Sequence, residues 1–216
     1  LHILQDGVDN VWVLAEDSLC LFDVSTGSFK HHDIAATAGF VLEDRCIFVA
    51  GDRIYGYDYK SGKLSEVLSF SSQGDYKVSE IFSWSDGSLL LTDMDKGALV
   101  YNPDGDSVSK CPFVPAGCDA VFADSRGRLW YSETGQGLRC LDQTGRVVGE
   151  YTTSNSAIPS DVILKIGEFQ GRIVALTDEG LCTLMSDHTG EMSIESQKAG
   201  DVFSFPTTSV SSMFCD

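Results

Sequence analysis

Polar side chains suited to ligand binding recur at one place in this sequence, just after a short apolar run. Each such place carries acidic, basic or amide side chains: Glu16 and Asp17, Asp52 and Arg53, Asp93, Asp95 and Lys96, Glu133 and Gln136, and Asp178 and Glu179. Converging carboxylates and amides hydrogen-bond sugar hydroxyls or hold a cation. Because Asp and Glu are also ordinary loop residues, a role in the turn alone stays open for each of them.

Two further candidates lie in the longer segments between these apolar runs. Tyr76 can stack on a sugar ring, and Asn155 can hydrogen-bond a hydroxyl. The predicted ligand-binding set is therefore Asp52, Arg53, Asp95, Lys96, Glu133, Gln136, Asp178, Glu179, Tyr76 and Asn155.

Catalytic and metal-binding motifs are absent from the sequence. A serine nucleophile elbow, GxSxG, does not occur, and the Gly-Asp-Ser at 105–107 falls in a predicted hairpin turn. The four histidines, His2, His31, His32 and His188, have neither HExxH nor facial-triad spacing. The sequence therefore predicts no catalytic residue, no metal site and no cofactor.

Seven cysteines form no CxxC pair, which argues against a zinc ribbon or a thioredoxin-type site. Cys20, Cys46, Cys140, Cys182 and Cys215 lie in predicted strands, where a thiol behaves as a small hydrophobe. A bridge between Cys111 and Cys118, which flank a Pro-rich loop, stays open if the compartment is oxidising.

The charge of the chain limits its partners. Fifteen Lys and Arg against 32 Asp and Glu give a formal charge of −17, which disfavours nucleic acid and anionic lipid surfaces because their phosphates would be repelled. No run of 18 apolar residues occurs, so we expect no direct membrane contact by this segment.

A loosely similar unit recurs five times along the chain and is more informative than any single motif. With Trp12, Ile47, Leu90, Trp130 and Val174 taken as equivalent, the spacing is 35 to 44 residues. Each unit reads as four short strands joined by Gly-containing turns, and its second strand is apolar at nearly every position. Such a strand is buried on both faces, as in a blade of a β-propeller.

The sequence therefore predicts an all-β fold with one partial β-propeller domain over residues 1–216. Its predicted blades cover residues 2–33, 39–69, 80–111, 119–152 and 162–197. Residues 209–216 match the opening strand at 2–6 and predict the first strand of a sixth blade. We expect an open arc of five blades; a fivefold ring in which one terminal strand replaces the other is the alternative. In either, the polar loops share one rim of the central channel.

The unit resembles the two-component-regulator propeller repeat, whose pattern is an apolar strand, Asp-x-x-Gly, a short apolar strand with Trp, and Thr-x-x-Gly-Leu before Tyr or Phe and Asp. The best matches are residues 124–130 with 137–138, residues 6–7 with 12 and 21–23, and the linker at 155–163. The similarity covers nearly the whole chain, although the second and third copies lack the Trp and much of the Asp-x-x-Gly turn.

The resemblance implies the periplasmic sensor region of a Bacteroidetes hybrid histidine kinase and response regulator, held in the inner membrane. Seven-bladed propellers precede a small β-sandwich and a transmembrane helix in that family, so the kinase would lie outside this segment. It implies glycan-derived signals, and hence an oligosaccharide ligand, the rest of the receptor chain as partner, and a homodimer. The propeller then either binds the oligosaccharide at its rim or is a scaffold that sets dimer geometry.

Two functions of other classes stay open. A propeller enzyme of the lactonase or lyase type needs a metal or a His–Glu pair facing the channel, and the sequence shows no such constellation. A protein–protein interaction platform of the WD-repeat kind carries Gly-His and Trp-Asp signatures, which this sequence lacks. We therefore expect a non-enzymatic sensor or scaffold propeller.

Overall fold

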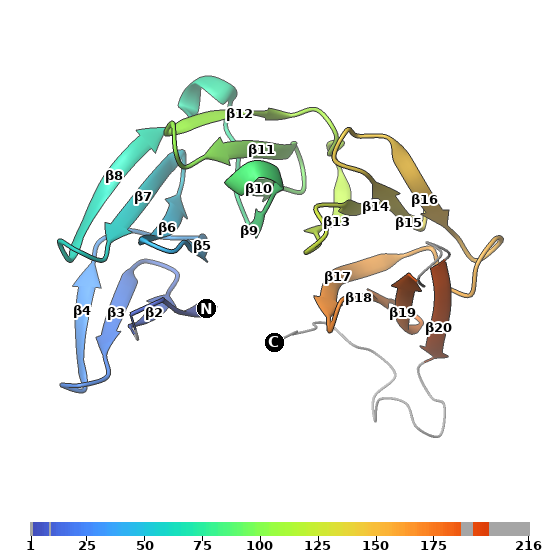
Figure 1. The fold of residues 1–216 in the computed structure, drawn as a ribbon, viewed down its shortest axis with the longest axis horizontal. Helices are drawn as coiled ribbons and strands as arrows, with labels where there is room; N and C mark the ends of the chain where they lie inside the picture. Colours follow the sequence, from blue (N-terminus) through green and yellow to red (C-terminus); the bar gives the residue numbers. More distant parts are fainter. Residues whose placement is uncertain (1, 9, 187–191, 199–216) are drawn as a thin grey trace. The chain divides into compact units, whose positions relative to one another are not determined.

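The computed structural model describes residues 2–8, 10–186 and 192–198, and within them the chain is all-β (Figure 1). Twenty strands in these residues form five four-stranded antiparallel sheets, accompanied by two 3₁₀ turns, Ser71–Gln73 and Ser85–Gly87. The strands of each sheet lie side by side in chain order, as in a propeller blade. The prediction of an all-β fold built from four-stranded sheets is confirmed.

The sheets fall into two compact units, of which the first holds sheets 1 and 2 and most of sheet 3. Sheet 1 consists of β1 (His2–Gln5), β2 (Val11–Leu14), β3 (Leu19–Asp23) and β4 (Ser28–His32). Sheet 2 consists of β5 (Ala38–Val41), β6 (Arg45–Ala50), β7 (Arg53–Asp58) and β8 (Lys63–Ser69). Sheet 3 consists of β9 (Glu80–Ser83), β10 (Leu89–Asp93), β11 (Gly97–Asn102) and β12 (Ser107–Cys111).

The second unit holds sheets 4 and 5. Sheet 4 consists of β13 (Cys118–Ala123), β14 (Leu129–Glu133), β15 (Leu138–Leu141) and β16 (Val147–Tyr151). Sheet 5 consists of β17 (Ile163–Phe169), β18 (Arg172–Thr177), β19 (Gly180–Ser186) and β20 (Met192–Lys198). The predicted strand at 209–216 lies outside the described residues.

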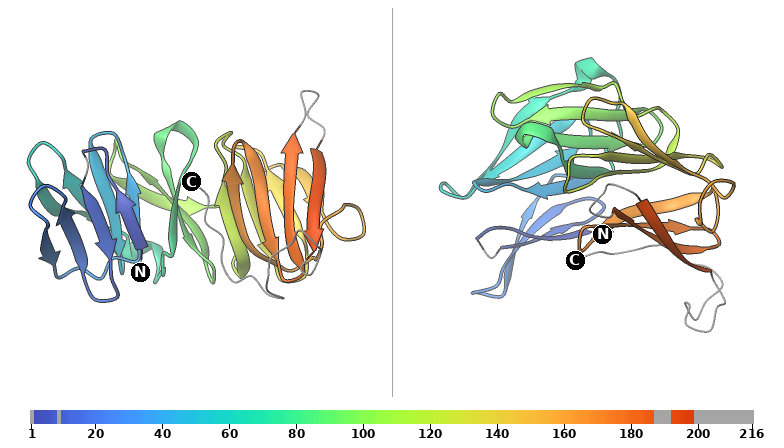
Figure 2. Two further views of the ribbon diagram at one scale, coloured as in Figure 1. Left: turned by 90° about the horizontal axis from the view of Figure 1, so that it is seen from below. Right: turned by 45° about the vertical axis from the view of Figure 1, so that its right-hand side comes forward.

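Strand β6 shows why the second strand of each sequence repeat is apolar at nearly every position. Cys46 and Phe48 pack with Trp12 in the core between sheets 1 and 2, which lie face to face in Figure 2. Ile47 and Val49, pointing the other way, belong to the core shared with sheet 3. All four β6 side chains are 0% exposed. Full burial of an apolar side chain of this size stabilises by roughly 1.5–3 kcal/mol, so both faces contribute to stability.

Sheets 4 and 5 share an equivalent core within the second unit. Trp130 and Leu138 of sheet 4 pack there with Ile163 and Ile173 of sheet 5, and each is at most 1% exposed. The Trp130 indole also stacks on Tyr151, with ring centroids 6.1 Å apart. Trp130 is equivalent to Trp12 in the repeat, so the same position fills the core in both units.

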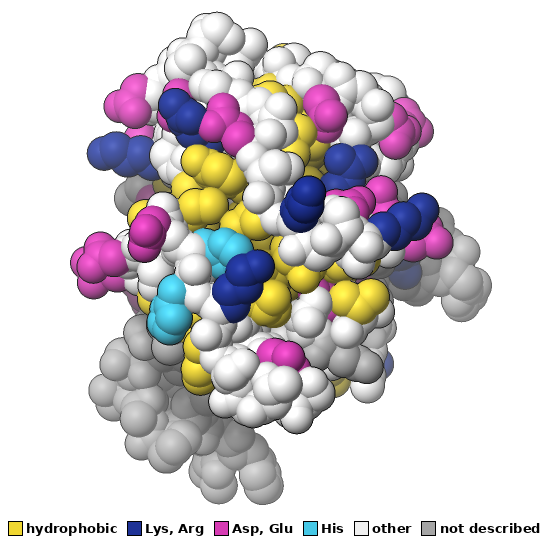
Figure 3. Space-filling model, turned by 90° about the vertical axis from the view of Figure 1, so that its left-hand side faces the viewer, with side chains coloured by type: hydrophobic (Ala, Val, Ile, Leu, Met, Phe, Trp, Pro, Cys, Tyr) yellow, Lys and Arg dark blue, Asp and Glu magenta, His cyan; other side chains and the backbone are white. Residues whose placement is uncertain are grey.

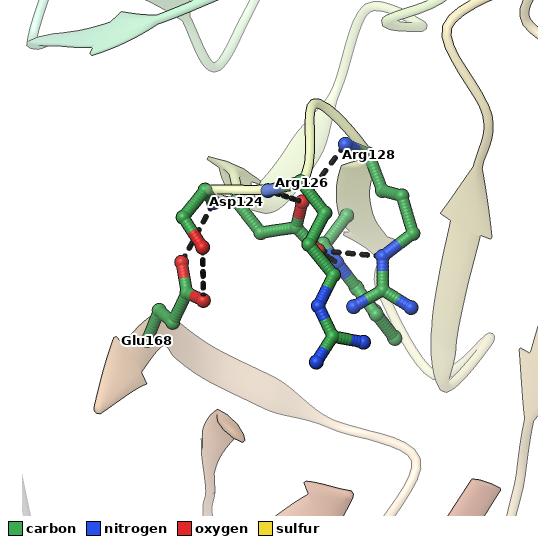
Figure 4. Close-up of polar contacts among 6 residues, drawn as sticks. Asp124, Arg126, Arg128 and Glu168 are labelled. Atoms are coloured by element: carbon green, nitrogen blue, oxygen red, sulfur yellow. Dashed lines mark hydrogen bonds and ion pairs between the residues drawn. The ribbon is translucent and has the colours of Figure 1, made fainter. Parts of the chain in front are cut away.

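A buried carboxylate fixes the turn before this tryptophan. Asp124, whose side chain is 0% exposed, accepts hydrogen bonds from the backbone N of Arg126 at 3.0 Å and of Arg128 at 2.8 Å (Figure 4). It also accepts one from Trp130 Nε1 at 2.8 Å, and Arg128 Nε forms an ion pair with it at 2.7 Å. The Asp-x-x-Gly turn therefore fixes the rotamer of the Trp130 indole as well as the backbone of the hairpin turn.

An Asp carboxylate makes the same hydrogen bonds in the turn of sheet 1. A further contact joins the Asp-x-x-Gly turn of sheet 4 to sheet 5. Asp6 accepts hydrogen bonds from the backbone N of Asn10 at 2.9 Å and from Trp12 Nε1 at 3.0 Å. In the second unit, the Glu168 carboxylate of β17 accepts from the backbone N and the Oγ of Ser125, at 2.7 and 2.6 Å (Figure 4). The turn thus links neighbouring sheets as well as neighbouring strands.

A second recurring turn joins the third and fourth strands. The carboxylates of Asp23, Asp58 and Asp142 each accept the backbone N–H of a Ser or Thr two or three residues later. Gly27, two residues beyond that Ser in sheet 1, has a φ of +66°, which L side chains rarely adopt. The Asp, the Ser or Thr and the Gly of the repeat are therefore one structural unit.

Apolar side chains also reach the surface of sheet 1. Ile3, Val24 and Phe29 are 68%, 61% and 55% exposed. Figure 3 looks onto this side of the first unit and shows hydrophobic side chains at the surface between charged ones. Exposed apolar side chains that are spread over a sheet in this way are common at protein surfaces.

Asp124→Ala should lower the free energy of unfolding by about 3 kcal/mol, because buried donors lose their acceptor and each loss costs roughly 1–3 kcal/mol. Urea denaturation measures the change. Asp142→Ala is the matched control, since Asp142 accepts from the backbone N of Thr144 and Arg146 in the same pattern but is 29% exposed. Equal losses in both variants would contradict the role given to Asp124.

Thr144→Ala should raise the pKa of Asp142 toward its ordinary value of 3.8, because the hydrogen bond from the Thr144 side chain is the main cause that holds this pKa below it. A lowered carboxyl pKa stabilises the fold above pH 3.8, and this contribution is lost as the pH falls through the lowered pKa. NMR titration of the carboxyl carbon measures the shift. The pKa of Asp58, lowered by its own bond with Ser61, should not move.

Candidate ligand-binding groove

In the first unit, the segments that lead into a sheet are fixed to the ends of that sheet's second strand. Thr37 N donates to Val49 O at 2.8 Å before β5, and Ser79 N donates to Thr92 O at 2.9 Å before β9. These bonds extend the pairing of the first and second strands by one step. The side chains just before each first strand are therefore held in place by the sheet.

Segment 75–79 is positioned by two contacts in addition to the bond from Ser79 N to Thr92 O. Lys77 N donates to Asp93 Oδ2 at 2.5 Å, and Asp93 is only 3% exposed. The Thr37 hydroxyl donates to Val78 O at 2.6 Å, which joins the segments before β5 and β9. Tyr76 and Val78 point into the core, at 6% and 2% exposure, so the alternation leaves Lys77 facing out.

Two adjoining cavities open along this segment. The first, of about 560 Å³, lies beside His2 and Glu16, and the second, of about 460 Å³, lies beside Asp52, Asp75 and Tyr76. Both are lined by the same three residues, Thr37, Lys77 and Val78. We call the two cavities together the rim groove. Each has the size of a site for a small molecule, about 300–1,000 Å³.

The rim groove offers both hydrogen-bond donors and acceptors. Glu16, Asp52 and Asp75 supply carboxylates, and Lys77 supplies an ammonium group. Among the described residues, no carboxylate forms an ion pair with Lys77. Burial raises the pKa of the Tyr76 phenol, so this hydroxyl stays protonated at neutral pH. Such a mixture suits a ligand whose groups both donate and accept, as hydroxyls do.

Of the predicted set, the structure brings Asp52 and Tyr76 together in the groove. Asp52 Oδ2 also accepts a hydrogen bond from Ser69 Oγ at 2.9 Å, which orients the carboxylate. The Tyr76 ring belongs to the core and only borders the cavity, so it does not present a broad face for stacking.

The other predicted residues of sheets 2 and 3 are not among those that line the groove. Arg53 forms an ion pair with Glu66 of β8, which raises the pKa of the guanidinium, and its Nε lies 3.8 Å from Asp52 Oδ1. Asp95 and Lys96 are exposed in the loop between β10 and β11. The register of β7 and β8 places Arg53 near Glu66, a pairing that loop position alone does not predict.

In the second unit, two of the predicted residues, Glu133 and Asn155, have local side-chain partners. Glu133 accepts from Arg139 Nη1 at 2.9 Å, and Asn155 Oδ1 accepts from Thr152 N at 2.8 Å within its own turn. Gln136, Asp178 and Glu179 are exposed in the loops after β14 and β18. Ligand binding by these residues stays a prediction.

Sequence reasoning missed three groove residues: Thr37, Asp75 and Lys77. They lie in the segments before β5 and β9, from which the predicted set includes only the aromatic Tyr76. The signal available was the alternation in Tyr76–Ser79, which reads as an extended segment with Lys77 on the polar side. Glu16 was recognised as part of a polar loop but not as part of the binding set.

Cysteine thiols and other potential metal ligands occur elsewhere in the described residues. Cys111 and Cys118 are both buried thiols, and burial raises the pKa of Cys118 to about 12. Within residues 2–8, 10–186 and 192–198, no three His, Cys, Asp or Glu side chains are grouped to hold a metal ion. In the same part of the chain, no helix has the length and apolar character needed to cross a membrane.

No protein-family model matches the sequence, and no curated protein matches it either. Solved structures share its fold. An extracellular domain assigned to a hybrid two-component system of B. thetaiotaomicron superposes with a TM-score of 0.68 at 16% identity, over 94% of this chain and 29% of that one. Virginiamycin B lyase from Staphylococcus aureus superposes with a TM-score of 0.66 at 14% identity, over 95% of this chain and 69% of that one.

The β-propeller domain of Cps50 (Swd1) from Myceliophteria thermophila is a third similar structure, with a TM-score of 0.65, 12% identity, and coverage of 91% and 70%. The fold is a β-propeller. The chain spans less than a third of the two-component extracellular domain, at 29% of its length. At these identities the similarity shows the fold and not the activity.

Asp93→Ala should remove the protection of the Lys77 amide in hydrogen exchange, because the carboxylate that accepts its N–H is lost. Asp93→Asn should retain part of the protection, since the side-chain amide oxygen still accepts. The amide of Ser79, which donates to Thr92 O, is the internal control and should stay protected. Unchanged exchange at Lys77 in the Ala variant would show that Asp93 does not position this segment.

Proposed function

We propose that this chain is a non-enzymatic ligand-sensing propeller from the extracytoplasmic part of a two-component receptor. The observation that carries the proposal is the rim groove, where carboxylates, an ammonium group and a phenol line two joined cavities. The likeness to extracellular domains of B. thetaiotaomicron, one assigned to a hybrid two-component system and one to a one-component system, supports the setting, at 16% identity in each case. The repeat pattern resembles that of the same receptor family.

The ligand we propose is an oligosaccharide released from a glycan. Sugar hydroxyls both donate and accept hydrogen bonds, which matches the mixed donors and acceptors of the groove. With a formal charge of −17, the chain favours a neutral ligand over a polyanion. In this proposal the rest of the receptor chain and a second copy are the protein partners, and the kinase lies in another part of the receptor. Binding in the periplasm would change the dimer that the kinase senses.

Asp52→Asn should weaken binding of the oligosaccharide about tenfold, because the amide loses the charge that strengthens its hydrogen bonds to hydroxyls. A glycan array of neutral, acidic and amino oligosaccharides first identifies a ligand, and isothermal titration calorimetry then compares the variants. Glu195→Gln makes the same charge change on the exposed outer strand β20 and should bind as the wild type does.

Two results would overturn this function. Absence of binding to every member of the array would exclude a glycan sensor and leave the scaffold role, in which the propeller sets dimer geometry. Turnover of a bound saccharide or lactone, detected by mass spectrometry, would favour the alternative that the chain is an enzyme. The similarity to a lyase structure is the reason to test this alternative.

A further inference from the structure

The two cavities of the rim groove are distinct in what lines them. The first is bordered by Leu14, which is 3% exposed, and by His2 and Glu16. The second is bordered by Asp52, Asp75 and Tyr76. One cavity therefore offers an apolar wall with a single carboxylate, and the other offers two carboxylates and a phenol. A single compact ligand would meet only one of these surfaces.

Lys77 lies at the junction of the two cavities, because it lines both together with Thr37 and Val78. Its backbone is held from two sides, by Asp93 Oδ2 at Lys77 N and by the Thr37 hydroxyl at the adjacent Val78 O. The backbone from which the Lys77 side chain projects is thus fixed by the sheet framework before a ligand binds. Binding then costs only the conformational freedom of the side chain itself and not that of the segment.

From this geometry we infer that the rim groove is a two-subsite groove for a ligand of at least two linked rings, with Lys77 as the specificity-determining residue at the link. This inference rests on the proposed function, since it takes the ligand to be a saccharide. One ring occupies the cavity beside Glu16, and its neighbour occupies the cavity beside Asp52. The Lys77 ammonium donates to the oxygen atoms around the linkage, which a monosaccharide does not present in both cavities at once.

The experiment measures the gain from the second ring. Glucose, xylose, arabinose, galactose and galacturonic acid are compared with their disaccharides and trisaccharides by titration calorimetry on the whole chain. For the sugar that binds, we expect the disaccharide to bind at least about tenfold more tightly than the monosaccharide, since filling a second subsite adds contacts without a second association cost. Lys77→Met should reduce this difference to about twofold, because it weakens binding of the disaccharide more than binding of the monosaccharide.

Lys110→Met is the matched control, because Lys110 is exposed on the outer strand β12 and carries the same charge. Thermal unfolding checks that both variants fold. Equal affinity of monosaccharide and disaccharide, or a disaccharide affinity that Lys77→Met leaves unchanged, would overturn the two-subsite inference while the sensor function stands. If no saccharide binds, either in the glycan array or in these titrations, the proposed function itself is overturned.

Discussion

The structure depends on one constraint, which is that apolar second strands such as β6 and β10 must be buried on both of their faces. A lone four-stranded sheet leaves both faces in water, so the apolar side chains on both sides of β6 would be exposed without neighbouring sheets. Packing sheet 2 between sheets 1 and 3 buries Cys46 and Phe48 on one side and Ile47 and Val49 on the other. Much of the stability therefore comes from contacts between neighbouring repeats, because one repeat alone cannot bury both of its faces.

That constraint also explains which parts of the fold the sequence predicts. A strand buried on both faces is recognisable by its composition, and the turn chemistry that follows Asp23, Asp58 and Asp142 recurs because each turn needs the same hydrogen bonds. The sequence predicts the order and approximate bounds of strands for the same reason. It does not predict that the Asp124 carboxylate binds the Trp130 indole, because that contact joins residues six apart across a hairpin whose register only the fold defines.

The candidate site is less predictable because its residues obey no period. Asp52 was found from its place after a second strand, but Lys77 and Thr37 lie in connecting segments whose conformation is set by bonds to neighbouring strands. Arg53 shows how a tertiary contact engages a residue of the predicted set, and its role in ligand binding stays a prediction. Its loop position indicates an open rim, yet the pairing of β7 with β8 brings Glu66 within reach and the two charges form an ion pair. Tertiary contacts decide which polar residues remain available to a ligand.

This division between framework and rim accounts for a fold shared at 12–16% identity among proteins with different descriptions. The residues that the framework needs are the apolar strand positions and a few turn carboxylates, and many sequences meet that need. Segments such as 75–79 are constrained mainly through their backbone, at Lys77 N and Val78 O, so the outward side chain is free to vary without loss of packing. Under the proposed function, a change there would alter ligand choice at little cost in stability, whereas a change in β6 would lower stability. Functional differences between propellers should therefore concentrate in such entry segments.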